Sequence, residues 1–128
     1  MPADVRRVRG TCGEQIAALF LEARGYEIVA RNVRAGRREI DLIASRGNTL
    51  VAVEVKWRRR DSPAGAGSEA WRSEQRARAA EAVLLRMSEF SSRPEQSWRF
   101  DLIVLEEEPN GLRLVHRRAA WSPANSWW

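Results

Sequence analysis

The sequence contains very little cysteine, histidine or lysine, and each shortage excludes a class of protein. One cysteine, Cys12, cannot form an internal disulfide, and with a single histidine, His116, the chain is too poor in ligands for a Cys/His zinc cluster. Lys56 is the sole lysine among 22 basic residues and follows Val55 rather than a glycine, so there is no Walker-type phosphate loop. The chain is therefore not a disulfide scaffold, a zinc finger or a Walker ATPase.

The sequence also lacks a long apolar run. Its longest uninterrupted apolar stretch covers residues 16–21, whereas a helix needs about 20 apolar residues to cross a bilayer. Hydrophobic residues nevertheless make up 44% of the 128 residues, which is typical of a chain with a packed core. We expect one soluble, cytoplasmic domain without a membrane segment.

Positive charge is unevenly distributed along the chain. Residues 1–60 contain 13 basic and 7 acidic residues, whereas residues 61–128 contain 9 and 10, so the whole basic excess lies in the first half. A concentrated basic surface is what binding to nucleic-acid phosphates requires. We expect the phosphate contacts to come from six arginines of this half: Arg6, Arg7, Arg9, Arg58, Arg59 and Arg60.

Apolar periodicity and turn residues predict a mixed α/β fold, a central sheet flanked by helices in the order α-β-β-β-α-β-β. Thr11 and Glu14 have the spacing of a capping box, and Gly25 is a helix stop. The sequence predicts helices over 12–24 and 68–88 and strands over 26–32, 38–44, 49–57, 98–105 and 112–116. Outside a single domain at 11–118, we expect a basic, flexible arm at 1–10 and a Trp-rich tail at 119–128.

Two acidic residues fall opposite each other if the second and third strands form a hairpin. A loop at Gly47 and Asn48 pairs Arg46 with Thr49, and the same register places Asp41 opposite Glu54. Like charges so placed destabilise a sheet unless a cation lies between them. A Mg²⁺ or Mn²⁺ ion held by the two carboxylates would satisfy them.

Such a site suits phosphodiester hydrolysis, because a bound metal stabilises phosphoryl charge and acidifies the attacking water. Lys56, two residues after Glu54, could orient that water. A plainer alternative is that Asp41 and Glu54 each form a surface ion pair with an arginine. Likewise, Glu14 could serve only as a helix cap, and Gln75 only as a solvated helix residue.

Several runs together resemble the YraN-like family of small bacterial proteins. These runs are Gly13-Glu14, Ala17-Ala18, Gly25-Tyr26, Arg31-Asn32, residues 39–44 and residues 53–56. That family is placed in the PD-(D/E)xK restriction-endonuclease-like superfamily and is likened to Holliday junction resolvases.

The resemblance implies a restriction-endonuclease-like core in which Asp41, Glu54 and Lys56 occupy the metal and catalytic positions. It adds Glu14 from the first helix and Gln75 from the second. Two residues depart from the family pattern: Arg38 stands where a glycine is usual, and Glu74 where a lysine is usual. Both change the charge close to the expected site.

Three functions follow from these observations. The first is a metal-dependent endonuclease-like protein acting on DNA phosphodiesters, with branched or structured DNA as the substrate implied by the resolvase likeness. The second is a nucleic-acid-binding module that retains the fold without cutting. The third is a structural or assembly protein that docks through its Trp-rich tail. The tail also leads us to expect a weak homodimer, because Trp127 and Trp128 are poorly suited to solvent.

Overall fold

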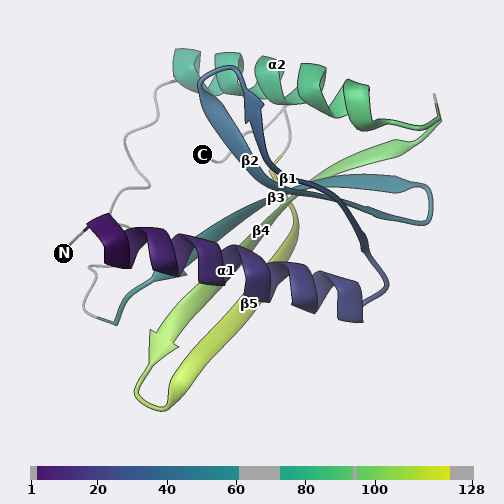
Figure 1. Ribbon diagram of the computed structural model, residues 1–128. Coiled ribbons are helices and arrows are strands. Elements are labelled where there is room, and N and C mark those ends of the chain that lie inside the picture. The colour runs from purple at the N-terminus through teal and green to yellow at the C-terminus, as the bar shows by residue number, and fades with distance from the viewer. Residues whose placement is uncertain (1–2, 61–72, 94, 122–128) are drawn as a thin grey trace.

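The computed structural model describes residues 3–60, 73–93 and 95–121. Two helices accompany five strands in this part of the chain (Figure 1). The helices are α1 (Ala3–Ala23) and α2 (Ser73–Phe90), and the strands are β1 (Glu27–Ala35), β2 (Arg38–Arg46), β3 (Thr49–Arg58), β4 (Ser97–Glu108) and β5 (Gly111–Trp121). The predicted architecture, a mixed central sheet flanked by helices in the order α-β-β-β-α-β-β, is confirmed.

The five strands form one sheet with the order β1-β2-β3-β4-β5. The first three strands are the expected antiparallel meander, β4 runs parallel to β3, and β5 returns antiparallel to β4. A parallel neighbour needs a long crossover, and α2 lies in the connection between β3 and β4.

Alternate residues of β3 pack against different helices, so the sheet is covered on both faces. Val51 and Val53 belong to the apolar cluster that includes Leu21 of α1, whereas Leu50 and Ala52 belong to the cluster that includes Met87 of α2. Successive strand residues point to opposite faces. The burial of Leu50 and Ala52 beside α2 shows that both faces of β3 belong to the core.

Helix α1 begins much earlier than predicted. Its first residue is Ala3 rather than residue 12, so the expected flexible arm is helical from residue 3 onward. Once a helix has formed over a packed segment, each further residue adds a hydrogen bond at little cost. An extension of this kind needs no apolar stripe, and Val8 is indeed 59% exposed. The predicted stop is confirmed, because Gly25 (φ 87°) and Tyr26 donate to the carbonyls of Glu22 and Leu21.

The C-terminal strand is also longer than predicted. β5 continues to Trp121, so residues 119–121 belong to the sheet rather than to the tail. The register between β4 and β5 shifts beside Asp101, and Ala119 adopts φ 50° there. The Ala119 N–H donates to the Asp101 carboxylate at 3.0 Å, which holds this irregular part of the strand in place. Trp127 and Trp128 lie outside the described residues.

Candidate active site at the separation of two strands

The predicted hairpin register is confirmed, but the strands separate before they reach the two acids. Arg46 pairs with Thr49, and the ladder continues only to Leu42 and Val53. Beyond that pair, Asp41 does not face Glu54 across a hydrogen-bonded ladder. Its Oδ2 instead accepts a hydrogen bond from the Val55 N–H at 2.7 Å. The carboxylate thus occupies the gap that opens between β2 and β3.

The pairing of β1 with β2 is interrupted at the same level. Arg31 pairs with Leu42 and Val33 with Ile40, while Asn32, which the register places opposite Asp41, has φ 52°. Asparagine tolerates this left-handed conformation better than most residues. The Asn32 side chain hydrogen-bonds to Glu14 and thereby links the kinked strand to α1.

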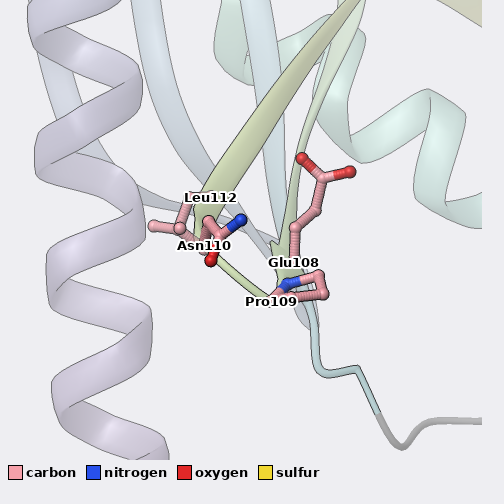
Figure 2. Close-up of a pocket in the computed structure, with 5 residues that line it drawn as sticks. Glu108, Pro109, Asn110 and Leu112 are labelled. Carbon is pink, nitrogen blue, oxygen red and sulfur yellow. The ribbon is translucent and has the colours of Figure 1, made fainter.

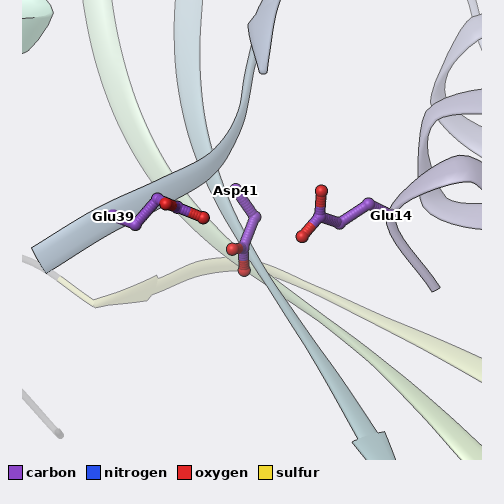
Figure 3. Close-up of side chains that lie close together, drawn as sticks. All are labelled: Glu14, Glu39 and Asp41. Carbon is purple, nitrogen blue, oxygen red and sulfur yellow. The ribbon is translucent and has the colours of Figure 1, made fainter. Parts of the chain in front are cut away.

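Three carboxylates meet at this point of the sheet. Oxygens of Glu14, Glu39 and Asp41 lie within 4.8 Å of one another. Figure 3 shows Asp41 between the other two, with Glu14 reaching in from α1 and Glu39 from the same strand as Asp41. The approach of α1 depends on Gly13, since a Cβ there would lie 3.3 Å from Leu105 Cδ1 and 3.4 Å from Trp57 Cε3.

The central acid of this cluster ionises with difficulty. The pKa of Asp41 is raised to about 7: burial is the largest cause, the negative charges of Glu14, Glu54 and Glu39 add to it, and the hydrogen bond from Val55 partly opposes them. Burial also raises the pKa of Glu14, against the hydrogen bond from Asn32. A group of carboxylates that resists ionisation is one that a cation would stabilise.

The donor set and its spacing fit a divalent metal ion. Calcium–oxygen distances are about 2.3–2.6 Å, so two oxygens that bind one ion lie at most about 5.2 Å apart, and the oxygens of this cluster all lie within 4.8 Å of one another. Hard divalent ions such as Mg²⁺, Mn²⁺ and Ca²⁺ prefer carboxylate oxygens. Glu14, Glu39 and Asp41 are thus the residues best placed to hold such an ion.

Glu54, the second acid expected from the sequence, lies outside this cluster. Its Oε1 forms an ion pair with the Arg38 guanidinium at 3.2 Å, and both side chains are largely covered. The Arg38–Glu54 contact is the kind of arginine ion pair that the plainer alternative expected for each acid. Glu54 still contributes to the site, because its charge raises the pKa of Asp41.

The predicted register, extended past Asp41 and Glu54, would place Glu39 opposite Lys56, but the β2–β3 ladder ends before either residue. Lys56 pairs with Val104 of β4 through its backbone. Within the described ranges, its half-buried side chain forms no hydrogen bond or ion pair. Gln75 lies in the first turn of α2, but its side chain is outside the described part of the chain. The catalytic roles of Lys56 and Gln75 remain predictions.

Glu39 is the site residue that sequence reasoning missed. It precedes Asp41 by two positions, and residues i and i+2 of a strand project on the same side. This periodicity would have grouped Glu39 with Asp41 rather than with Lys56.

The six arginines predicted to contact phosphate differ in their exposure and in their ion pairing. Arg9 forms an ion pair with Glu107 at 3.4 Å, and Glu107 also accepts a hydrogen bond from the Trp57 indole. Arg58 and Arg59 are half-buried and Arg60 is exposed at the end of β3. Arg6 and Arg7 lie within α1, but their side chains are outside the described part of the chain.

A second polar cluster surrounds Asp101, whose side chain is fully buried in β4. Arg99 donates to both of its oxygens at 2.8 Å, and His116 Nε2 lies 2.8 Å from Oδ2. Arg99 also donates to the Tyr26 hydroxyl at 2.5 Å. Burial alone would raise the pKa of Asp101, but the hydrogen bonds from Arg99, Ala119 and His116 lower it overall. The sequence suggested no partner for His116, and this cluster provides one.

A shallow pocket lies at the β4–β5 turn (Figure 2), lined by Glu108, Pro109, Asn110, Gly111 and Leu112. It shares no residue with the acidic cluster.

Neither of the described helices is long and apolar enough to cross a membrane.

Comparison with known proteins places these features in a family. The family described as "Uncharacterised protein family UPF0102" matches residues 13–105. A UPF0102 protein of Symbiobacterium thermophilum is 46% identical over 83% of this chain and 87% of its own length. One from Erythrobacter litoralis is 34% identical over 96% of this chain and 100% of its own.

Among solved structures, Pyrococcus furiosus SfsA in complex with Ca²⁺ is similar at 16% identity and a TM-score of 0.41, over 88% of this chain and 63% of that one.

The matched family segment contains Glu14, Glu39, Asp41, Glu54 and Lys56. The family relationship expected from the sequence is confirmed, and the chain belongs to the uncharacterised protein family UPF0102.

Proposed function

We propose that this protein is a metal-dependent, endonuclease-like protein that acts on DNA phosphodiesters. One observation carries the proposal: the oxygens of Glu14, Glu39 and Asp41 converge within 4.8 Å where β2 and β3 separate. A bound Mg²⁺ or Mn²⁺ would stabilise charge on the phosphoryl oxygens and lower the pKa of an attacking water. It would also compensate the shared negative charge of this cluster.

The residues of the chain have separate roles in this proposal. Asp41 is the central metal ligand, because its carboxylate is oriented by the Val55 N–H and lies between Glu14 and Glu39. Glu54 is a further ligand from β3, as expected from the sequence. Lys56 orients the water that attacks the phosphate, and Gln75 contributes from α2. The arginines at the end of β3 hold the DNA backbone, since guanidinium groups match phosphate geometry.

The experiment is a cleavage assay with controls for both metal and site. Purified protein is incubated with duplex, single-stranded and four-way-junction DNA, with Mg²⁺, with Mn²⁺ and with EDTA. We expect metal-dependent products that disappear in Asp41→Asn, while Glu108→Gln, a change at the exposed β4–β5 turn, leaves them intact. Products that persist in EDTA or in Asp41→Asn would rule out this site as their source.

A second candidate is a DNA-binding module that does not cut. The Arg38–Glu54 ion pair favours it, because an acid engaged by an arginine is not available to a metal in that arrangement. DNA retention in a gel-shift assay without cleavage of any of the three substrates, in either metal, would support this candidate over the first.

Self-association is a separate proposal. We infer a weak homodimer, since two-fold substrates such as junctions suit a two-fold protein with one site per chain. Light scattering on the full chain and on a chain truncated after Ser122 tests it. A monomer in both samples at the concentration used for cleavage would exclude the dimer there.

A further inference from the structure

The Arg38–Glu54 ion pair closes one side of the candidate metal site. Arg38 is the first residue of β2 and lies three positions before Asp41, while Glu54 lies on β3 next to the residue that binds the Asp41 carboxylate. The guanidinium and carboxylate are 3.2 Å apart, and their side chains are only 15% and 29% exposed. The pair therefore spans the opening between the two strands that also receives Asp41.

The positive charge of Arg38 interacts with two acids at this opening, Glu54 and Asp41. Burial lowers the pKa of Arg38, and the negative charges of Glu54 and Asp41 oppose that effect. The same residue thus neutralises Glu54 directly and reduces the excess negative charge around Asp41. In the absence of a metal, it is the cation that β2 itself supplies to the site.

Separating the two partners of a largely buried ion pair has a high free-energy cost. Removal of one member leaves an uncompensated charge, which is strongly destabilising. A metal ion that engaged Glu54 would leave the Arg38 guanidinium without its carboxylate, in a position where water reaches it poorly. The cost falls if an anion takes the place of Glu54, and a guanidinium fork binds a phosphate particularly well.

We propose that Arg38 is a substrate-binding residue that exchanges partners during assembly of the site: the metal takes Glu54, and the substrate phosphate takes Arg38. The inference rests on the proposed function, because it requires a divalent metal and a phosphodiester at this site. No charge is left unpaired after the exchange, since one ion pair is replaced by a metal–carboxylate and a guanidinium–phosphate contact.

The exchange makes metal and phosphate binding mutually dependent. A phosphodiester that binds Arg38 frees Glu54, so it must raise the affinity for metal, and by linkage the metal must raise the affinity for phosphate by the same factor. Coupling of this kind is typically about 5–150-fold. Without Arg38, Glu54 is free from the start, so the metal binds more tightly, and the phosphate strengthens metal binding only through its direct contact with the metal.

The test measures Mn²⁺ affinity from the signal of free Mn²⁺ in electron paramagnetic resonance, corrected with a protein-free blank. The proteins are the wild type, Arg38→Met and Arg31→Met. Arg31 is a matched control because its charge also acts on the cluster, through Glu14, but its guanidinium binds Gln15 and not Glu54. Each protein is titrated alone, with a thymidine dinucleotide, and with its uncharged methylphosphonate analogue.

For the wild type, we expect the charged dinucleotide to tighten Mn²⁺ binding about fivefold or more, and the methylphosphonate to have no effect. Arg38→Met should bind Mn²⁺ more tightly than the wild type without dinucleotide, and the dinucleotide should tighten its Mn²⁺ binding by a smaller factor than in the wild type, because only the direct metal–phosphate contact remains. Adding Glu54→Gln to Arg38→Met should abolish the tighter Mn²⁺ binding of the single variant. Arg31→Met should keep the dinucleotide effect. Arg38→Gln replaces Arg38→Met if circular dichroism shows that the latter does not fold.

Two results would overturn the inference alone while Mn²⁺ still binds in an Asp41-dependent manner. One is equal Mn²⁺ affinity in Arg38→Met and Arg31→Met, which would reduce the role of Arg38 to general charge. The other is a dinucleotide effect on Mn²⁺ affinity that is as large in Arg38→Met as in the wild type. If neither the wild type nor Arg38→Met binds Mn²⁺, the proposed function fails and the inference falls with it.

Discussion

The Asp41 carboxylate accepts a hydrogen bond from the backbone N–H of Val55 at 2.7 Å. This bond replaces the regular pairing between β2 and β3, which ends one residue earlier, at Leu42 and Val53. The acid is thus held rigidly in the opening between β2 and β3, beside two further carboxylates. This arrangement lowers stability in the absence of a cation, because three like charges are held close together. The first prediction follows from that cost.

Asp41→Asn should stabilise the protein in EDTA at alkaline pH. The folded-state pKa of Asp41 is about 7, well above the unfolded value of about 3.9, so ionisation opposes folding. The penalty is absent below the unfolded pKa, grows as the pH rises and is complete above the folded pKa. We expect a gain of about 1–2 kcal/mol at pH 8.5 and none at pH 3.5, measured by urea unfolding.

Saturating Mn²⁺ should reverse the order of the two proteins, because only the wild type gains the binding free energy. A lower stability of Asp41→Asn in EDTA at pH 8.5 would show that the carboxylate contributes favourable contacts that outweigh the repulsion.

Asp101→Asn should have the opposite dependence on pH. The pKa of Asp101 is lowered by its hydrogen bonds, so its ionised form stabilises the fold above the unfolded pKa, and this contribution disappears as the pH falls through the folded value. We expect a loss of about 2–4 kcal/mol at pH 7, since the substitution leaves Arg99 without its buried counter-charge. The difference from the wild type should shrink toward pH 2, as measured by thermal or urea unfolding. A constant difference from pH 7 to pH 2 would mean that packing, rather than charge, explains the loss.

Gly10→Ala and Gly13→Ala form a matched pair within α1. Both remove a glycine from a helix interior, which should add about 0.8–1 kcal/mol of stability. A Cβ at Gly10 meets nothing within 4 Å, so Gly10→Ala should show that gain as a higher melting temperature. A Cβ at Gly13 would meet Leu105 at 3.3 Å and Trp57 at 3.4 Å, so Gly13→Ala should not show the gain and should move Glu14 away from Asp41.

Weaker Mn²⁺ binding in Gly13→Ala than in Gly10→Ala is the corresponding functional readout. Equal stability and equal Mn²⁺ affinity in the two variants would show that the packing of α1 on the sheet does not position Glu14.

The arginines at the end of β3 can be tested by the salt dependence of DNA binding. Each arginine that no longer neutralises a phosphate should lower the slope of log affinity against log salt by about 0.9 for duplex DNA, so the triple change of Arg58, Arg59 and Arg60 to alanine should lower it by up to about 2.7. The matched control changes three arginines of β5, Arg113, Arg117 and Arg118, to alanine. Fluorescence anisotropy at several salt concentrations measures both slopes. If the slope falls as far in the β5 variant as in the β3 variant, the DNA path is not the one proposed.

Local sequence patterns accounted for most of the fold and for part of the site. Alternating apolar residues and the Gly47-Asn48 turn were sufficient to predict the β2–β3 register, because a hairpin is a local structure whose loop sets its pairing. Gly25 was sufficient to end α1, since a left-handed residue there completes the hydrogen bonds of the last turn. The hairpin register predicted Asp41 as a metal ligand and the family resemblance added Glu14, and the structure brings these two carboxylates together.

Contacts between distant parts of the chain decided the rest. The register could not reveal that β2 and β3 separate at Asp41, or that Arg38 pairs with Glu54, because both depend on the three-dimensional course of the two strands. The pairing of His116 with Asp101 joins residues on adjacent strands around an irregular stretch of β5, for which the sequence carries no periodic signal. Local sequence patterns thus determined the type and order of the elements, whereas tertiary packing determined which charged side chains share a site, because charge pairing depends on distances of a few ångströms that local patterns do not encode.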